Sequence, residues 1–452
     1  MKRLLLWLGL LLLVVGIYWW LGNRSATVNA NPSTSDTSST SVIDTTANAP
    51  TKVFSIEDAA LDTTSIQLQA QEIQLGDGTR FSLNIPEGFR MIPAAEGLRR
   101  VRFFSKAPDG RLFVTGMHAL YDNKKGKIFI LDDFDAETGK FKSVIVWKDK
   151  LRNPNSIAFY QDKAGKDWIY VALTDKLIRY PFQHGETSPT GASEKIADFP
   201  GYGLNYKYGG WHLTRTIAIH EDKLYVSVGS SCNLCEERLD EPSRASIMVM
   251  NPDGSDARIF AKGVRNAVDI GWVHNKLYAT NMASDHLGND KPNDYLYQVK
   301  DGENYGWPYC YEHEGVIYKE NPNDLSDNKV PGAEKKTAWE REPYPCDSVA
   351  NAYALLEPHG APLGFEYCDA TTASPALRNY FLVALHGSTL AKVGTGHRIV
   401  RVKKGHSPQP VIDGFLKGKE RVGRPCDIFQ WDDHSFFISD DHAGVVYYLS
   451  SK

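Results

Sequence analysis

Leu224-Tyr225-Val226, with His212 standing 13 residues before the tyrosine, is one copy of a unit that recurs along the chain. Three further copies keep this spacing between a cationic residue and the aromatic residue of a short strand-like run: Arg100 before Phe113, Arg265 before Tyr278 and Arg424 before Phe437. Two looser copies fill the gaps: Asn155 before Tyr170 and His359 before Leu382. Internal repeats with a period of about 40–50 residues are typical of propellers and solenoids.

The spacing of the six runs decides between six and seven blades. Their central residues are 57, 55, 53, 104 and 55 residues apart, so the long interval holds either a seventh blade or an insertion. We favour an insertion because the interval contains Asn304-Tyr305-Gly306-Trp307-Pro308, two cysteines and a charged stretch at residues 320–341 with little strand patterning. The sequence therefore predicts an all-β, six-bladed β-propeller.

Composition agrees with a β-rich globular domain. The 452 residues include 22 Tyr, 19 Phe, 10 Trp and 37 Gly, and long amphipathic helical stretches are hard to find after residue 80. The formal net charge of −4 leaves no electrostatic footprint for nucleic acid. Ordered structure should begin near residues 68–83, which are expected to supply a strand that closes the ring.

The polar residue that starts each unit indicates a site. The first strand of every propeller blade lines the central axis, so equivalent residues at the starts of these strands converge. A ring of three Arg, two His and one Asn favours an anionic ligand, because buried cations without partners are costly. If the repeat served only to build sheet, the charged residues would remain unexplained. The competing partners for the cations are four carboxylates: Asp269, Asp427, Asp440 and Asp441.

The N-terminal residues predict a membrane anchor. Lys2 and Arg3 precede 19 residues without a charge, at positions 4–22, and Trp19 and Trp20 lie at their far end. This length matches a membrane span, so we favour an uncleaved transmembrane signal anchor at residues 1–22. A cleaved signal peptide is the alternative, although residues 28–30 make a poor cleavage site.

The residues after the anchor predict a tether and an exported domain. Residues 33–46 hold hardly any large apolar side chains beyond Val42 and Ile43, and residues 23–67 are predicted to be a flexible linker. Residues 68–452 form the predicted propeller catalytic domain. We expect a single-pass protein of the cell membrane whose catalytic domain is periplasmic or extracellular.

Six cysteines fit an exported chain in which disulfides persist. Cys232-Asn233-Leu234-Cys235 has CxxC spacing, for which we favour a structural disulfide over a free thiol pair or a metal or redox site. The absence of a His directly after Cys235 excludes c-type haem attachment. Cys310 and Cys346 flank the insertion, so we expect a second bridge between them.

Three ring residues suit catalysis on an anionic or polar group. His212 lies in Gly209-Gly210-Trp211-His212-Leu213-Thr214-Arg215, and an imidazole with a pKa near neutrality is the usual general base. The alternative for an isolated His is a structural hydrogen-bonding role. Arg265 and Arg424 each offer a planar fork that suits carboxylates or a developing oxyanion.

Five motifs occur in one order: Trp211-His212 with Arg215 following, residues 225–232, Arg265-Asn266, residues 304–308, and Gly423-Arg424-Pro425. Over roughly residues 80–452, this order and spacing resemble the pyrroloquinoline-quinone-dependent sugar dehydrogenases, and in particular the L-sorbosone dehydrogenase-like and soluble aldose dehydrogenase-like branches. The resemblance implies a six-bladed propeller that holds pyrroloquinoline quinone, a tricarboxylate, over its axis together with a calcium ion.

The resemblance also implies residue roles. His212 would be the general base that removes the hydroxyl proton of the sugar, whose C1 then gives a hydride to the quinone. Arg265 would polarise the quinone oxygen with Asn266 beside it, and Arg424 would pair with a cofactor carboxylate. The remaining cofactor contacts are expected to be Asn155, Arg215, His359 and His386.

Calcium is held in family members largely through backbone carbonyls that follow the second strand of the fourth blade. Here that loop is residues 284–290, and we expect Gly288 and Asn289 to be the ligands, since oxygen donors suit a hard cation. Two positions depart from glucose-oxidising relatives. Cys426 stands where they have a second Arg, and His386 lies near the place of a Lys.

The sequence thus predicts an exported quinoprotein that oxidises an aldose or related sugar at C1 and passes electrons to a quinone or cytochrome of unknown identity. Two alternatives remain. One is a non-catalytic propeller that binds a small ligand or partner, because propellers host many unrelated functions. The other is a calcium-dependent lactonase-like hydrolase, which would usually need carboxylates and Asn around its metal, whereas this ring is rich in Arg and His.

Overall fold

The computed structural model describes residues 50–53, 65–201, 211–237, 239–321, 345–389 and 393–451. The predicted signal anchor at residues 1–22 lies outside the described residues, as does most of the predicted linker at residues 23–67. Among the described residues, no helix is long and apolar enough to cross a membrane. The linker region contributes one described strand, β1 (Pro50–Val53).

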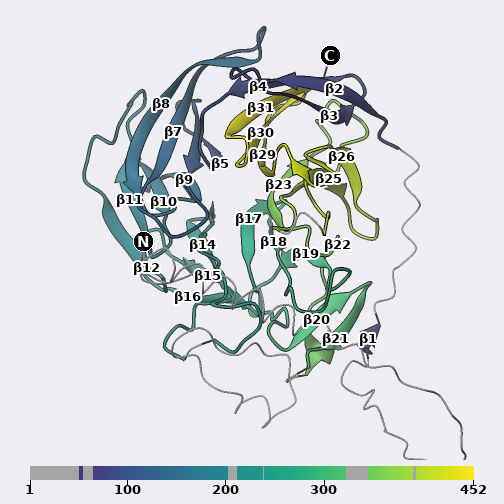
Figure 1. The fold of residues 1–452 in the computed structure, drawn as a ribbon. Helices are drawn as coiled ribbons and strands as arrows, with labels where there is room; N and C mark the ends of the chain where they lie inside the picture. Colours follow the sequence, from purple (N-terminus) through teal and green to yellow (C-terminus); the bar gives the residue numbers. More distant parts are fainter. Residues whose placement is uncertain are drawn as a thin grey trace, which may run out of the picture. The chain divides into compact units, whose positions relative to one another are not determined.

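Six four-stranded antiparallel sheets form the blades of a propeller (Figure 1). From the axis outward, blade 1 consists of β5 (Val101–Lys106), β6 (Leu112–Gly116), β7 (Gly126–Asp135) and β8 (Lys140–Leu151). Blade 2 consists of β9 (Ser156–Gln161), β10 (Asp167–Ala172), β11 (Lys176–Pro181) and β12 (Glu194–Asp198). Blade 3 consists of β13 (Ile217–His220), β14 (Lys223–Val228), β15 (Ser246–Met250) and β16 (Arg258–Lys262). Blade 4 consists of β17 (Ala267–Val273), β18 (Lys276–Asn281), β19 (Asp294–Val299) and β22 (Ala354–Leu356). Blade 5 consists of β23 (Pro362–Cys368), β24 (Tyr380–Leu385), β25 (Arg398–Val402) and β26 (Gln409–Ile412). Blade 6 consists of β29 (Pro425–Asp432), β30 (Ser435–Asp440), β31 (Val445–Ser451) and β4 (Phe89–Ala95).

The first strands of the six blades contact one another in a closed ring that runs β5, β9, β13, β17, β23, β29 and back to β5. Every strand-like run of the sequence repeat falls in the second strand of its blade, and every polar residue that marks the repeat precedes the first strand. The predicted all-β, six-bladed propeller is therefore confirmed.

The strand that closes the ring is not the one expected. This strand was predicted at residues 68–83, but β4 pairs with β31 as the outer strand of blade 6. Residues 68–83 lie instead in the hairpin of β2 (Leu68–Gln74) and β3 (Arg80–Pro86), whose apolar side chains join the core between blades 5 and 6. The prediction was wrong by one strand because several neighbouring apolar segments could have paired with the free edge of β31.

The long interval between the fourth and fifth runs is an insertion within blade 4, as predicted. It lies between β19 and β22, and its described part holds the hairpin of β20 (Cys310–His313) and β21 (Val316–Lys319) and the 3-10 turn η3 (Cys346–Ser348). The predicted disulfide between Cys310 and Cys346 joins the hairpin to that turn. Strand β1 pairs with β21 along the outer edge of the hairpin.

The apolar core lies between the blades. Six clusters each combine buried side chains of two adjacent blades, one cluster for every interface around the ring. All residues of the second strands β6, β24 and β30 are buried, because both faces of these strands pack against other blades. This burial explains why the repeated runs are continuously apolar instead of alternating with polar residues.

Polar side chains join the blades close to the axis. Hydroxyl groups of second strands donate to main-chain carbonyls of the next blade: Thr115 Oγ1 to Asn155 O (2.7 Å), Thr280 Oγ1 to Leu363 O (2.6 Å) and Ser439 Oγ to Arg102 O (2.7 Å). Two Asp side chains also join neighbouring blades, by accepting hydrogen bonds from main-chain N–H groups. Asp269 binds the N–H of Phe365 (2.9 Å) and Asp427 that of Phe104 (2.8 Å), so both fasten blades and neither serves as the counter-charge considered for the Arg ring.

Candidate functional site

One cavity of about 580 Å³ lies at the end of the axis where the first strands begin. It brings together most of the predicted site residues, although they come from loops far apart in the sequence. The predicted residues that line it are His212, Arg265, Asn266, Gly288, Asn289, His359, His386 and Arg424. Four of the eight, His212, Arg265, His359 and Arg424, belong to the predicted ring of six and converge as the repeat predicts. The other two ring residues, Arg100 and Asn155, do not line the cavity.

Three of the six residues that mark the repeat share a backbone feature. Arg100, His212 and His359 have φ angles of 54°, 46° and 57°, in the left-handed region that non-glycine residues rarely occupy. Such conformations persist only where the surrounding structure holds them, and they are frequent at functional sites. The spacing seen in the sequence thus records a turn that recurs at the entrance to a blade.

His212 is held in one tautomer. Its Nδ1 lies 2.9 Å from the main-chain oxygen of Ser230, which can only accept, so Nδ1 carries the proton. The Ser230 hydroxyl, also 2.9 Å from Nδ1, donates its own proton to Cys232 O. Burial, reinforced by the nearby Arg265 cation, lowers the pKa of His212 well below its ordinary value. The imidazole is neutral, with its lone pair on Nε2, which is the state that a general base requires.

Gly229 packs against His212 so closely that no larger residue would fit at position 229. A Cβ atom at Gly229 would lie 2.5 Å from the Cβ of His212 and 2.7 Å from Oδ1 of Asn266. This Asn266 oxygen is buried and has no hydrogen-bond partner among the described residues. Gly229 therefore permits the close approach of His212 and Asn266, and Asn266 retains an acceptor at the cavity wall.

Arg424 carries a buried charge that no described carboxylate neutralises by an ion pair. Its Nε donates to His386 O (2.9 Å) and a terminal nitrogen donates to Gly387 O (2.5 Å), both of them main-chain carbonyls. Burial lowers the pKa of Arg424 to about 10, although the nearby carboxylate of Asp441 opposes this shift, so the group is still charged at neutral pH. A buried guanidinium of this kind favours an anion in the cavity.

A second cluster of charge centres on Asp441. Its carboxylate lies 3.3 Å from a guanidinium nitrogen of Arg100 and of Arg102, and 2.8 Å from Nε2 of His386. Arg102, from β5, lines the cavity, whereas Arg100 does not. The spacing of the repeat pointed to Arg100 and not to Arg102, although side chains two residues apart in a strand share a face.

Arg265 is held by the loop between the cysteines of the CxxC motif. Its Nε donates to Asn233 O and a terminal nitrogen donates to Asn233 Oδ1, each over 2.8 Å. The carboxylate of Asp285 lies 3.6 Å from the same guanidinium. Arg265 is buried and lines the cavity, and burial lowers its pKa. Nothing in the spacing of the repeat pointed to Asn233.

His359 hydrogen-bonds to the loop that is predicted to bind calcium. His359 Nε2 lies 2.6 Å from Gly288 O, and its Nδ1 lies 3.1 Å from the Asp285 carboxylate. The bond to Asp285 raises the pKa of His359, whereas burial opposes it. Gly288 O, Asn289 and the Asp285 carboxylate nevertheless form a set of oxygen donors on one wall of the cavity, which is the ligand chemistry that calcium prefers.

Two predicted cofactor contacts lie outside the cavity lining. Asn155 is buried beneath it, accepts from Nε of Arg102 (3.0 Å) and donates to Thr216 (2.9 Å). Arg215 donates to the main-chain oxygens of His212 and Thr214, each over 2.7 Å. Their positions suit support of Arg102 and of the His212 turn better than direct contact with a ligand.

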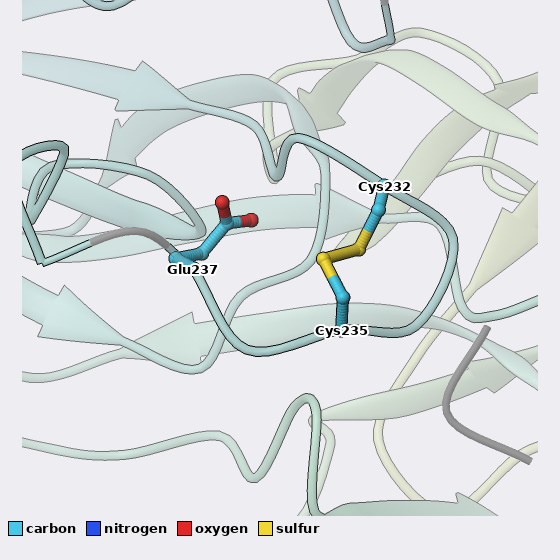
Figure 2. A group of neighbouring side chains, drawn as sticks. All are labelled: Cys232, Cys235 and Glu237. Carbon is cyan, nitrogen blue, oxygen red and sulfur yellow. A yellow bond between two sulfur atoms is a disulfide. The ribbon is translucent and has the colours of Figure 1, made fainter. Parts of the chain in front are cut away.

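The CxxC motif forms a disulfide, as favoured from the sequence. Cys232 and Cys235 are bonded to each other, and the carboxyl group of Glu237 points toward them (Figure 2). These three side chains bring possible metal ligands within 4.8 Å of one another. With both sulfurs in the disulfide, however, neither is a thiolate ligand.

The chain belongs to the TrAA12-like family, whose profile matches residues 83–451. A relative from Borreliella burgdorferi, described only as an uncharacterized protein, is 25% identical over 85% of this chain and 93% of its own length. Among solved structures, the fold resembles the holo form of the pyrroloquinoline quinone domain of pyranose dehydrogenase from Coprinopsis cinerea, with a TM-score of 0.58 and 19% identity over 81% of this chain and 97% of that one.

A second solved structure carries the family name in its description. The calcium structure of a Carbohydrate-Active Enzymes Family AA12 protein from Trichoderma reesei is similar with a TM-score of 0.62 and 15% identity, over 87% of this chain and all of that chain. The predicted resemblance to pyrroloquinoline-quinone-dependent sugar dehydrogenases is thereby confirmed at the level of family and fold.

We predict that Asp441→Asn destabilises the fold. The change leaves the buried guanidinium of Arg102 and the partly exposed one of Arg100 without their counter-charge. The loss should reduce the free energy of unfolding by about 3 kcal/mol in urea titrations at pH 7. Asp133→Asn is the control, because its pair with Lys142 is exposed and should contribute less than about 1 kcal/mol.

The effect should depend on pH. Burial alone would raise the pKa of Asp441, but His386 and Arg102 lower it far below its usual range. The ionised carboxylate of Asp441 therefore contributes its full stabilisation at pH values above about 3.9, the pKa of Asp in the unfolded chain. This stabilisation is lost as the pH falls from there toward the lower pKa of the folded state. Equal stabilities of the wild type and Asp441→Asn at pH 7 would contradict this account.

Proposed function

We propose that this chain is a sugar dehydrogenase that uses pyrroloquinoline quinone. The observation that carries the proposal is a neutral imidazole with a free Nε2, at His212, in one cavity with three buried guanidiniums. Family membership supports the cofactor class, and the pyranose dehydrogenase domain supports a sugar as the substrate. The hydroxyl at C1 of an aldose is the group that we expect to be oxidised.

The cavity suits a planar tricarboxylate. Arg102, Arg265 and Arg424 place three guanidiniums in its lining, to which the apolar residues Val268 and Leu363 also belong. Arg424, which has no ion pair among the described residues, would hold a cofactor carboxylate, with Arg102 close to it. Asn266 and Arg265 would lie near the reactive carbonyl oxygens. When bound, pyrroloquinoline quinone supplies an electrophilic quinone that accepts a hydride.

The residues of the chain divide the remaining work. His212 accepts the hydroxyl proton of the sugar at Nε2, while Ser230 holds Nδ1–H and so keeps the ring oriented. The Arg265 guanidinium stabilises negative charge that develops on an oxygen beside it. Trp211 and Leu120, which are partly exposed and line the cavity, offer apolar surface at its mouth and exclude water.

Calcium is part of the proposal. The main-chain oxygens of Gly288 and Asn289 and the carboxylate of Asp285 would hold it beside the cofactor, which requires His359 to release Gly288 O. The oxygen-rich donor set and the calcium structure of the Trichoderma reesei protein support this assignment. Export, the membrane anchor at residues 1–22 and transfer of electrons to a quinone or cytochrome remain part of the same proposal.

We predict sugar oxidation that depends on pyrroloquinoline quinone and calcium. The purified protein should reduce an electron-accepting dye in the presence of an aldose only after both are added. His212→Gln, which keeps a polar side chain of similar size but offers no base, should lower kcat by about 10²–10⁴-fold. Wild-type activity in this variant would contradict the assigned base. A wild type that neither binds the cofactor nor oxidises any aldose would instead favour the non-catalytic binding propeller.

The pH profile provides an independent prediction. A general base acts in its neutral form, and burial together with Arg265 lowers the pKa of His212. As the pH falls from 8, kcat/KM should therefore stay constant past 6.5, the usual pKa of His, and decrease only at lower pH. An acid limb above pH 6.5 would point instead to His359, whose pKa is raised.

A further inference from the structure

The disulfide loop of blade 3 contacts both residues to which we assign chemistry. Ser230, two residues before Cys232, accepts the Nδ1–H of His212 through its main-chain oxygen. The N–H of Ser230 donates to the main-chain oxygen of Arg265 over 2.8 Å. Ser230 therefore connects the proposed base of blade 3 to the main chain of Arg265, the residue that opens blade 4.

Asn233 is the only residue of the loop to bind the Arg265 side chain in the described structure, and it does so twice. Its main-chain oxygen accepts from Nε, and its Oδ1 accepts from a terminal nitrogen, each over 2.8 Å. Two parallel acceptors on a planar guanidinium fix its orientation as well as its position. The same Oδ1 accepts the N–H of Asp285 over 2.9 Å, so Asn233 also places the carboxylate next to Arg265.

Four contacts keep the Asn233 loop in place. The Cys232–Cys235 disulfide closes it into a small ring, and Leu234 within the ring is fully buried. Glu237 accepts the N–H of Ser231 over 2.7 Å, and Figure 2 shows its carboxyl group facing the disulfide. From the insertion in blade 4, the indole N–H of Trp307 donates to Asn233 O over 3.2 Å.

We propose that Asn233 is the positioning residue that aims the Arg265 guanidinium into the cavity, and that the Cys232–Cys235 disulfide holds Asn233 for this purpose. Cross-linking the loop removes conformations in which the two oxygens of Asn233 would point elsewhere. The inference rests on the proposed function only for the role of Arg265 in the reaction. The positioning itself belongs to the cofactor-free protein.

The test measures how fast phenylglyoxal modifies Arg265 in the cofactor-free, full-length protein, with the modified peptides quantified by mass spectrometry. Arg424, a second buried arginine of the same cavity, serves as the internal reference. Cys232→Ser/Cys235→Ser should raise the rate at Arg265 relative to Arg424 by about tenfold, the ratio that corresponds to one lost charge-assisted hydrogen bond.

Variants of Asn233 separate positioning from general stability. Asn233→Leu removes the Oδ1 acceptor and should raise the relative rate at Arg265 several-fold, whereas Asn233→Asp keeps an oxygen at this place and should restore slow modification. An unchanged rate in Asn233→Leu, or failure of Asn233→Asp to restore slow modification, would overturn the proposal.

The second disulfide supplies the matched control. Cys310→Ser/Cys346→Ser also removes one cross-link but leaves the Asn233 ring closed, so it should lower the unfolding temperature without changing the relative reactivity of Arg265. An equal gain of reactivity in this control would show general loosening and would contradict the assigned role. Because no cofactor is added, a failure of pyrroloquinoline quinone to bind leaves this test intact.

Discussion

The compensation of positive charge at the axis is the constraint on which the site depends. Arg102, Arg265 and Arg424 are buried where the first strands begin. The guanidinium of each interacts with a different kind of partner. Asp441 neutralises Arg102, the two oxygens of Asn233 bind Arg265, and main-chain carbonyls bind Arg424. Because carbonyls orient a guanidinium without neutralising it, Arg424 leaves charge for an anion to satisfy.

The propeller supplies what this arrangement needs. Its apolar core is divided among the interfaces between blades, so the axial end of each first strand is free to carry polar residues. The hydroxyl of Thr115 and the carboxylate of Asp427 fasten neighbouring blades through main-chain groups. Loops from different blades are thereby held at fixed distances, and His212 can keep one tautomer over a cavity that several blades share.

The repeat made most of this predictable, and its limits have physical causes. Continuous apolar runs recur because second strands are buried on both faces, and a turn with positive φ recurs at His212 and His359. Pairing choices are not encoded in this way, which is why the closing strand was placed one strand too early. Asn155 is one of the six predicted ring residues, yet its side chain lies beneath the cavity and accepts a hydrogen bond from Arg102.

Asn233 shows what a spacing argument leaves out, since its role arises only when a loop of blade 3 meets the start of blade 4. The central claim is that the buried charge of Arg424, which forms no ion pair among the described residues, binds an anionic cofactor. Calorimetric titration of pyrroloquinoline quinone into the cofactor-free protein, with calcium present, tests it most directly. The account predicts binding that weakens in higher salt and falls at least about tenfold in affinity in Arg424→Gln. Equal affinity of this variant and the wild type, or no binding to either, would contradict it.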